Sequence, residues 1–199
     1  MALHGTLVKS VTMAPDFTFR HAHQYFLDKA DHHLKVLVAY AKSNNIDLTA
    51  LHQRDIVLGV FQVVFDGAGF FRFAGDKEAG TAAIITEVKG EDDMDVVDLV
   101  AWDIAKPELF GCYEGMPVLG IANASNPATW SFAGALFVHR TPLGWAQAGG
   151  KGVVILQHEY AYRCFDDNLG PLLCEDQAHA SEVHKMLSPP PFDSTKILF

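Results

Sequence analysis

Cysteine is scarce in this sequence, and its few cysteines do not form a motif. The chain of 199 residues contains 3 of them, Cys112, Cys164 and Cys174, an odd number with no CxxC spacing. Such a set does not provide a disulfide framework or a cysteine-rich zinc site. We therefore expect free, mostly buried thiols in a reducing compartment.

Positive charge is also in short supply. The sequence has 15 Lys and Arg against 24 Asp and Glu, which gives a formal net charge of −9 at pH 7 with neutral histidines. A net negative field repels polyanions unless a basic patch overcomes it, and here the basic residues are scattered singly or in loose pairs. Binding of DNA or RNA by charge attraction is therefore not expected.

Long apolar runs and common catalytic motifs are absent as well. The N-terminal stretch lacks the basic start and unbroken apolar core that export requires, and no run approaches the length of a membrane-spanning helix. The motifs HExxH, GxSxG and GxGxxG do not occur, which removes the usual basis for metalloprotease, hydrolase and dinucleotide-enzyme assignments. We expect a cytoplasmic protein without a membrane partner.

The sequence is organised around two apolar, β-branched runs, Ala82–Val88 and Val96–Trp102, with a short acidic turn between them. These runs predict a buried β-hairpin. Ile56–Phe65 and Phe70–Phe73 precede it and are separated by Gly- and Asp-rich turns, which is typical of an antiparallel meander. With 49% hydrophobic and 20% charged residues, the composition suits an ordinary globular core.

Helices are expected near both ends of the chain. Phe19–Ser43 has apolar residues at helical spacing, and Asn44 and Asn45 suit a helix end. Pro171–Leu187 has available apolar residues and is stopped by the prolines at 189–191. The expected buried stripe of the first helix comprises Ala22, Tyr25, Phe26, Ala30, Leu34, Leu37, Val38 and Ala41.

The later part of the chain changes in texture. Residues 106–135 are punctuated by Gly, Pro and Asn, and the pattern then predicts a strand, a short helix and a strand at Leu136–Arg140, Pro142–Ala148 and Gly152–Leu156. We predict an α+β fold with a long N-terminal helix, a mostly antiparallel sheet, a small mixed β-α-β segment and a C-terminal helix. One domain, 1–199, is expected, with any sub-boundary near 106–135.

One candidate catalytic site lies around the predicted hairpin. Asp76 precedes the first of its strands, and Glu87-Val88-Lys89 ends that strand. This spacing resembles that of metal-dependent nucleases, in which two carboxylates hold Mg²⁺ or Mn²⁺ and a lysine stabilises or orients the attacking water. Asp76, Glu87 and Lys89 are therefore candidate catalytic residues. The simpler interpretation, a solvated strand edge, stays open.

The 10 histidines raise the question of a metal site. His21, Asp28 and His32 share a face of the expected N-terminal helix, and Asp176 and His179 share a face of the C-terminal one. Helical residues at these separations are more often solvated or hydrogen-bonded than ligating, so no metal ligand is assigned.

A second candidate site lies at the junction of the strand and the short helix. His139, Arg140 and Trp145 surround a helix N-terminus that could receive an anion, so they are the candidate ligand-binding residues. In the alternative, Trp145 belongs to the core and Arg140 satisfies a loop carbonyl or a carboxylate. The nearby GWAQAGGKG is not a phosphate-binding loop, because Gly152 follows Lys151 and the glycines end a helix.

Three segments carry a resemblance: VDLVAWD, LFVHRTPLGWAQAGGKGVVIL and GPLLCEDQAHASEVHKML. They resemble small proteins without assigned function from bacterial, alphaproteobacterial-type, phage and prophage regions. The resemblance covers roughly the C-terminal half and supplies no catalytic residues. It implies a phage-associated origin, and Asp76, Glu87 and Lys89 lie outside it.

The leading hypothesis for function is a non-catalytic accessory protein of phage type that acts through protein or small-ligand contacts. It follows from the lack of any complete catalytic constellation in the sequence. The alternative is a metal-dependent nuclease or phosphodiesterase, for which Mg²⁺ or Mn²⁺ would be the cofactor. Sheet edges and 14 Phe residues would allow a homo-oligomer.

Overall fold

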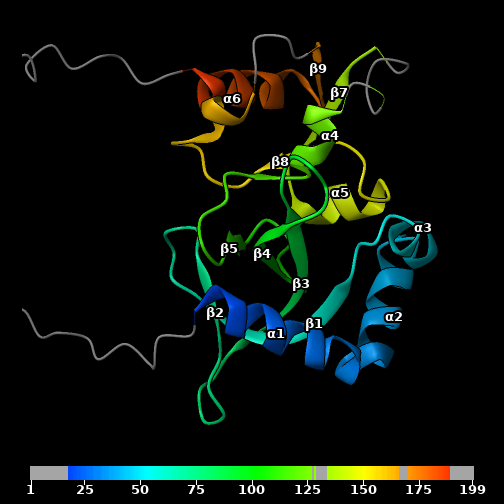
Figure 1. Ribbon diagram of the computed structural model, residues 1–199, viewed down its shortest axis with the longest axis vertical. Coiled ribbons are helices and arrows are strands. Elements are labelled where there is room, and N and C mark those ends of the chain that lie inside the picture. The colour runs from blue at the N-terminus through cyan, green and yellow to red at the C-terminus, as the bar shows by residue number, and fades with distance from the viewer. Residues whose placement is uncertain (1–17, 127, 129–133, 166–169, 189–199) are drawn as a thin grey trace, which may run out of the picture.

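A computed structural model describes residues 18–126, 128, 134–165 and 170–188 of the chain. The α+β class is confirmed, with one antiparallel sheet, one mixed sheet and helices at both ends. Figure 1 shows α6 (Gln177–Leu187) near one end of the molecule and α1 (Phe19–Lys29) toward the other. In the part of the chain described, no helix is long and apolar enough to cross a membrane.

The first sheet is the predicted meander, extended by one strand. Its order is β2 (Phe71–Phe73), β1 (Leu58–Phe65), β3 (Thr81–Lys89), β4 (Val96–Asp103) and β5 (Phe110–Cys112), and all neighbours pair antiparallel. The two edge strands also approach each other, because Phe70 forms an isolated parallel bridge with Cys112. The sheet is therefore strongly curled.

The predicted hairpin is β3 and β4, and it is buried on both faces. Ile84 pairs with Trp102 and points to one core, whereas its neighbour Ile85 pairs with Ala101 and points to the other. All four side chains are fully buried. Burial of a large apolar side chain contributes about 1.5–3 kcal/mol, so residues on both faces of this hairpin stabilise the fold. This explains the nearly continuous apolar runs in the sequence.

The second sheet contains the predicted β-α-β segment. Its order is β6 (Val118–Leu119), β8 (Val153–Ile155), β7 (Leu136–His139) and β9 (Leu172–Cys174). The strands β7 and β8 are parallel and are joined through α5 (Pro142–Gln147), while β6 pairs antiparallel with β8. The mixed character of the segment is confirmed.

The long N-terminal helical region is present but broken. Helix α1 is followed by a 3-10 turn, η1 (Ala30–His33), and by α2 (Leu34–Ser43). The turn packs closely on β1, since a Cβ on Gly59 would lie 3.1 Å from the Cα of Ala30. A 3-10 turn is wound more tightly than an α-helix, so it changes which face of the following helix meets the sheet.

The break changes the expected buried stripe. Phe26 and Ala30 enter the core on one face of the first sheet, whereas Leu37, Tyr40 and Ala41 after the break enter the core on the other. The expected burial of three further residues is wrong, because Tyr25, Leu34 and Val38 are 40%, 50% and 48% exposed. A single unbroken periodicity does not describe a helical segment that contacts both faces.

The expected C-terminal helix is correct only in its second part. Leu172–Cys174 is β9, which pairs parallel with β7, and the helix α6 begins at Gln177 after Asp176 caps it. The apolar residues Leu172 and Leu173 suit either element, and pairing with a distant strand decides between them. Shorter elements are α3 (Leu48–His52), α4 (Ile121–Ser125) and η3 (Ala161–Cys164).

Asp98 of β4 ties the first sheet to the second. Its buried carboxylate accepts five backbone hydrogen bonds of 2.7–3.0 Å, from the N–H groups of Leu99, Tyr113, Glu114, Gly115 and Met116. Burial raises the pKa of Asp98, and these hydrogen bonds oppose the rise. Because Met116 leads into β6, the carboxylate fixes the connection between the sheets.

Candidate functional site

The predicted site residues are divided between two hollows in the structure. The first, which we call the inter-sheet pocket, has a volume of about 170 Å³ and is lined by Glu87, Lys89 and Trp145 among others. The second, the histidine pocket, has a volume of about 260 Å³ and is lined by His139 and Arg140 among others. The candidate ligand-binding set is therefore not assembled, because Trp145 lies in a different pocket from His139 and Arg140.

Trp145, in the second half of α5, lies in the wall of the inter-sheet pocket. Thr141 begins this helix with its Oγ1 accepting the N–H of Gly144 at 3.2 Å, and Pro142 follows in the first turn, where its missing N–H costs nothing. Only 3% of Trp145 is exposed. Among the buried side-chain polar atoms of the described residues, its indole Nε1 is the one without a hydrogen-bond partner.

An unpaired buried N–H is costly, so Trp145 differs from an ordinary core residue. Leaving a buried donor without an acceptor costs about 1–3 kcal/mol. Trp102, which is equally buried, shows the usual solution: its Nε1 donates to the hydroxyl of Tyr40 at 3.0 Å. The indole of Trp145 has the same capacity and does not use it within the part of the chain that the structure describes.

Asn123 and Gly120 form the pocket wall around this donor. Asn123 is buried, and its Nδ2 donates to the carbonyl oxygens of Gly150 and Gly152 at 3.0 and 2.8 Å. Gly120 has a φ of +79°, and a Cβ there would lie 2.6 Å from the Gly152 oxygen and 3.0 Å from Trp145 Nε1. A side chain at position 120 would therefore clash with the wall and crowd the indole nitrogen.

The charged groups of the pocket come from the loop before β1, from β3 and from the acidic turn between β3 and β4. Arg54 donates through Nη2 to Oδ1 of Asn123 at 2.7 Å. Glu87 Oε1 lies 2.6 Å from Nε2 of His23, and Lys89 Nζ lies 3.7 Å from Oδ1 of Asp93. Glu87 and Lys89 line the same pocket, as their spacing on one strand face predicts.

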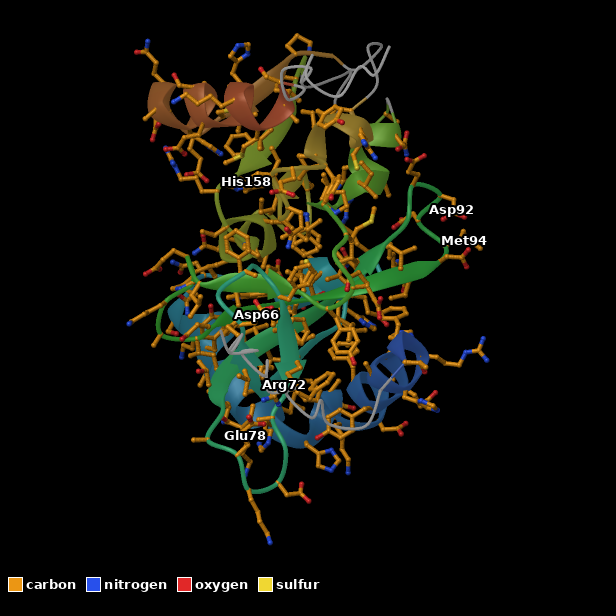
Figure 2. All side chains as sticks on the ribbon, turned by 90° about the vertical axis from the view of Figure 1, so that its left-hand side faces the viewer. Asp66, Arg72, Glu78, Asp92, Met94 and His158 are labelled. Atoms are coloured by element: carbon orange, nitrogen blue, oxygen red, sulfur yellow. The ribbon has the colours of Figure 1, made fainter. Side chains whose placement is uncertain are left out.

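Asp76 does not join Glu87 and Lys89. It lies in the loop between β2 and β3, whereas the other two residues lie near the far end of β3. The six steps from Thr81 to Glu87 along the strand span about 20 Å, at about 3.3 Å per residue. Figure 2 shows Glu78 of the same loop and Asp92 beyond the strand at opposite ends of the sheet. The two carboxylates therefore cannot share a metal ion here, and the geometry does not support the nuclease alternative.

Arg140 of the histidine pocket is fully engaged by carboxylates. Its Nη2 binds both oxygens of Asp176 at 2.8 and 3.0 Å, its Nη1 binds Glu182 at 2.8 Å, and its Nε lies 3.4 Å from Glu175. The hydrogen bond to Asp176 raises the pKa of Arg140. This guanidinium holds β7 to α6 and is not free for an anion, as in the alternative interpretation from the sequence.

The buried histidines of the same pocket also have protein partners. His139 Nε2 donates to the carbonyl of Lys151 at 2.9 Å, and His179 Nδ1 accepts the N–H of Glu175 at 3.3 Å. Desolvation lowers the pKa of His139 and of His179, which favours the neutral form of both rings. His158 also lines this pocket, and Figure 2 shows it below α6.

Metal binding has no prepared site in the described residues. No group of three or more His, Cys, Asp or Glu there is arranged to hold a metal ion. On α1 and η1, Asp28 accepts from Gln24, and His32 lies 3.4 Å from Lys29. The three cysteines are free thiols, and burial raises the pKa of Cys112 to about 11, which makes it unreactive.

Arg54, Gly120 and Asn123 were not predicted as site residues. Arg54 is far from the other two in the sequence, and the three meet because the loop before β1 and the start of α4 line the same pocket. Of the three, only Gly120 could have been noticed in the sequence, since glycine suits a backbone that needs a positive φ.

Comparisons of the chain with protein-family models, with curated proteins and with solved structures found no match.

Proposed function

We propose that this chain is a non-catalytic accessory protein that binds a small polar molecule in the inter-sheet pocket. The observation that carries the proposal is the buried indole N–H of Trp145, which has no acceptor among the described residues. A ligand that supplies an acceptor removes the cost of about 1–3 kcal/mol attached to that donor. The association with phage stays a prediction.

The geometry of the pocket also favours a small ligand. Its volume of about 170 Å³ is enough for a small molecule and below the about 300–1,000 Å³ of pockets that hold drug-sized ligands. Its walls are held in place before any ligand binds, because Asn123 is fixed by Arg54 and by two backbone carbonyls. A prepared wall reduces the ordering cost of binding.

A thermal-shift screen tests the proposal. Small polar molecules at about 10 mM are added to the wild type, to Trp145→Phe and to Arg140→Gln. A compound with a Kd of about 1 mM would stabilise the wild type by about 1.4 kcal/mol. We expect active compounds to lose their effect in Trp145→Phe, which keeps an aromatic ring but removes the N–H donor, and to keep it in Arg140→Gln.

Two outcomes would contradict the proposal. In the first, no compound raises the melting temperature of the wild type more than that of Trp145→Phe. In the second, the active compounds depend on Arg140 and not on Trp145, which would place binding in the histidine pocket.

A further inference from the structure

The inner wall of the inter-sheet pocket offers a ligand a hydrogen-bond donor. Trp145 Nε1 has no partner among the described residues, whereas the nearby amide donor of Asn123 is used twice, by Gly150 and by Gly152. The complementary group on a ligand is therefore an acceptor, such as a carbonyl or hydroxyl oxygen. A cation cannot meet this N–H directly, so a bare metal ion would leave the donor unpaired.

The outer part of the pocket offers negative charge. Its ionisable groups are two cations and five carboxylates: Arg54, Lys89, Asp55, Glu87, Glu91, Asp92 and Asp93. Glu87 is held by His23 and Asp93 is held by Lys89. In the described part of the chain, Asp55, Glu91 and Asp92 form no ion pair. These three carboxylates outnumber the one remaining cation, Arg54.

The two chemistries together define a ligand class. We infer that the pocket takes a small organic cation that carries a hydrogen-bond acceptor, with the acceptor at Trp145 and the cationic group among the carboxylates. This inference rests on the proposed function and narrows it. The net charge of −9 also favours a cationic ligand, because a negatively charged protein raises the concentration of cations near its clefts.

A set of three matched compounds tests the inference. 4-Aminobutanamide carries an ammonium group and an amide oxygen, butanamide carries the amide alone, and succinamate carries the amide with a carboxylate. The full chain, labelled with ¹⁵N, is titrated with each compound while the indole N–H signals are followed. The chain has 3 tryptophans, and Trp→Phe variants assign the signals of Trp102 and Trp145.

We expect 4-aminobutanamide to shift the Trp145 indole signal and to leave that of Trp102 unchanged, because Trp102 already donates to Tyr40. Its Kd should be about tenfold lower than that of butanamide, and succinamate should bind more weakly than butanamide. Raising the salt concentration should reduce the difference in Kd between 4-aminobutanamide and butanamide.

Charge variants sharpen the assignment. The double variant Asp55→Asn, Glu91→Gln should weaken the binding of 4-aminobutanamide by about three- to tenfold and leave the binding of butanamide unchanged. Asp95→Asn is the matched control, since Asp95 is an exposed carboxylate in the same acidic turn that does not line the pocket. It should leave both compounds unaffected.

The outcomes separate this inference from the proposed function. If butanamide or succinamate shifts the Trp145 signal as strongly as the ammonium compound, the cationic class is wrong while small-ligand binding stands. If none of the three compounds shifts that signal at tens of millimolar, both the inference and the proposed function are overturned. A preference for the cation that survives in the double variant also overturns the inference.

Discussion

The inter-sheet pocket and the histidine pocket differ in how completely their polar groups are satisfied. The histidine pocket is the larger, at about 260 Å³ against 170 Å³, and it contains Arg140 and two buried histidines. Yet Arg140 already binds three carboxylates, and both rings have backbone partners. The smaller pocket instead contains a buried donor, Trp145 Nε1, that has no acceptor among the described residues. Unused hydrogen-bonding capacity therefore separates the two pockets better than volume or charged lining does.

Asp98 is the opposite of Trp145, because its buried carboxylate accepts five backbone hydrogen bonds. Its replacement should have the largest effect on stability. In Asp98→Asn, the amide NH₂ would face backbone N–H groups that donate to a carboxylate oxygen in the wild type. The resulting unpaired donors should lower the free energy of unfolding by on the order of 3 kcal/mol. Urea denaturation measures the change. Asp95→Asn, an exposed carboxylate in a turn, is the control and should stay within about 0.5 kcal/mol of wild type.

The two buried tryptophans provide the most direct pairwise comparison. Trp102→Phe leaves the Tyr40 hydroxyl without its partner, whereas Trp145→Phe removes a donor that has no acceptor in residues 18–126, 128, 134–165 and 170–188. Both changes remove similar volume from buried sites, so their difference isolates the hydrogen bond. Trp102→Phe should cost about 1–2 kcal/mol more than Trp145→Phe in unfolding free energy. Equal costs would mean that Trp145 is satisfied by a group in the protein.

Because of the buried histidines in the histidine pocket, we expect the protein to lose stability under mildly acidic conditions. Desolvation lowers the folded-state pKa of His139 below its unfolded value of 6.5. As the pH falls below about 6.5, the unfolded chain takes up this proton first, so stability decreases, by at most about 1.4 kcal/mol per pH unit for this residue. His179 acts in the same direction.

Thermal unfolding between pH 7.5 and 5 tests this, above the range in which ordinary carboxylates protonate. His139→Gln should flatten the profile, because glutamine can still donate to Lys151 without binding a proton. An unchanged slope in this variant would assign the acid sensitivity to other groups.

The smallest expected effect concerns anions. Phosphate at about 20 mM should not raise the melting temperature beyond what chloride at equal ionic strength does, because Arg140 is occupied by Glu175, Asp176 and Glu182. A phosphate-specific rise that is abolished in Arg140→Gln would restore the anion site suggested by the strand-to-helix junction.

Local sequence signals predicted the elements whose partners are close in the chain. The β3–β4 hairpin follows from two β-branched runs and a turn, and α5 follows from Pro142 in its first turn and the glycines after it. The 3-10 break at Ala30–His33 and the strand Leu172–Cys174 were missed. Both depend on contacts with distant strands, β1 in one case and β7 in the other, that no local pattern contains.

The site was predicted in fragments for the same reason. Glu87, Lys89 and Trp145 were each singled out, but in two separate hypotheses, because Lys89 and Trp145 are 56 positions apart in the sequence. The core shared by the first sheet, α5 and β8 brings them to one pocket. The carboxylates that occupy Arg140 lie 35 to 42 residues further along the chain, so its ion pairs could not be read locally either.

A crystal structure grown with 4-aminobutanamide, at a resolution that shows ordered water, tests the central claim most directly. The decisive observation is the atom that accepts the hydrogen bond from Trp145 Nε1. We predict an acceptor from outside the chain, the amide oxygen of the ligand, at about 2.9 Å. The account would be contradicted if Nε1 donates instead to an oxygen of the protein itself, such as the carbonyl of Gly150 or Gly152.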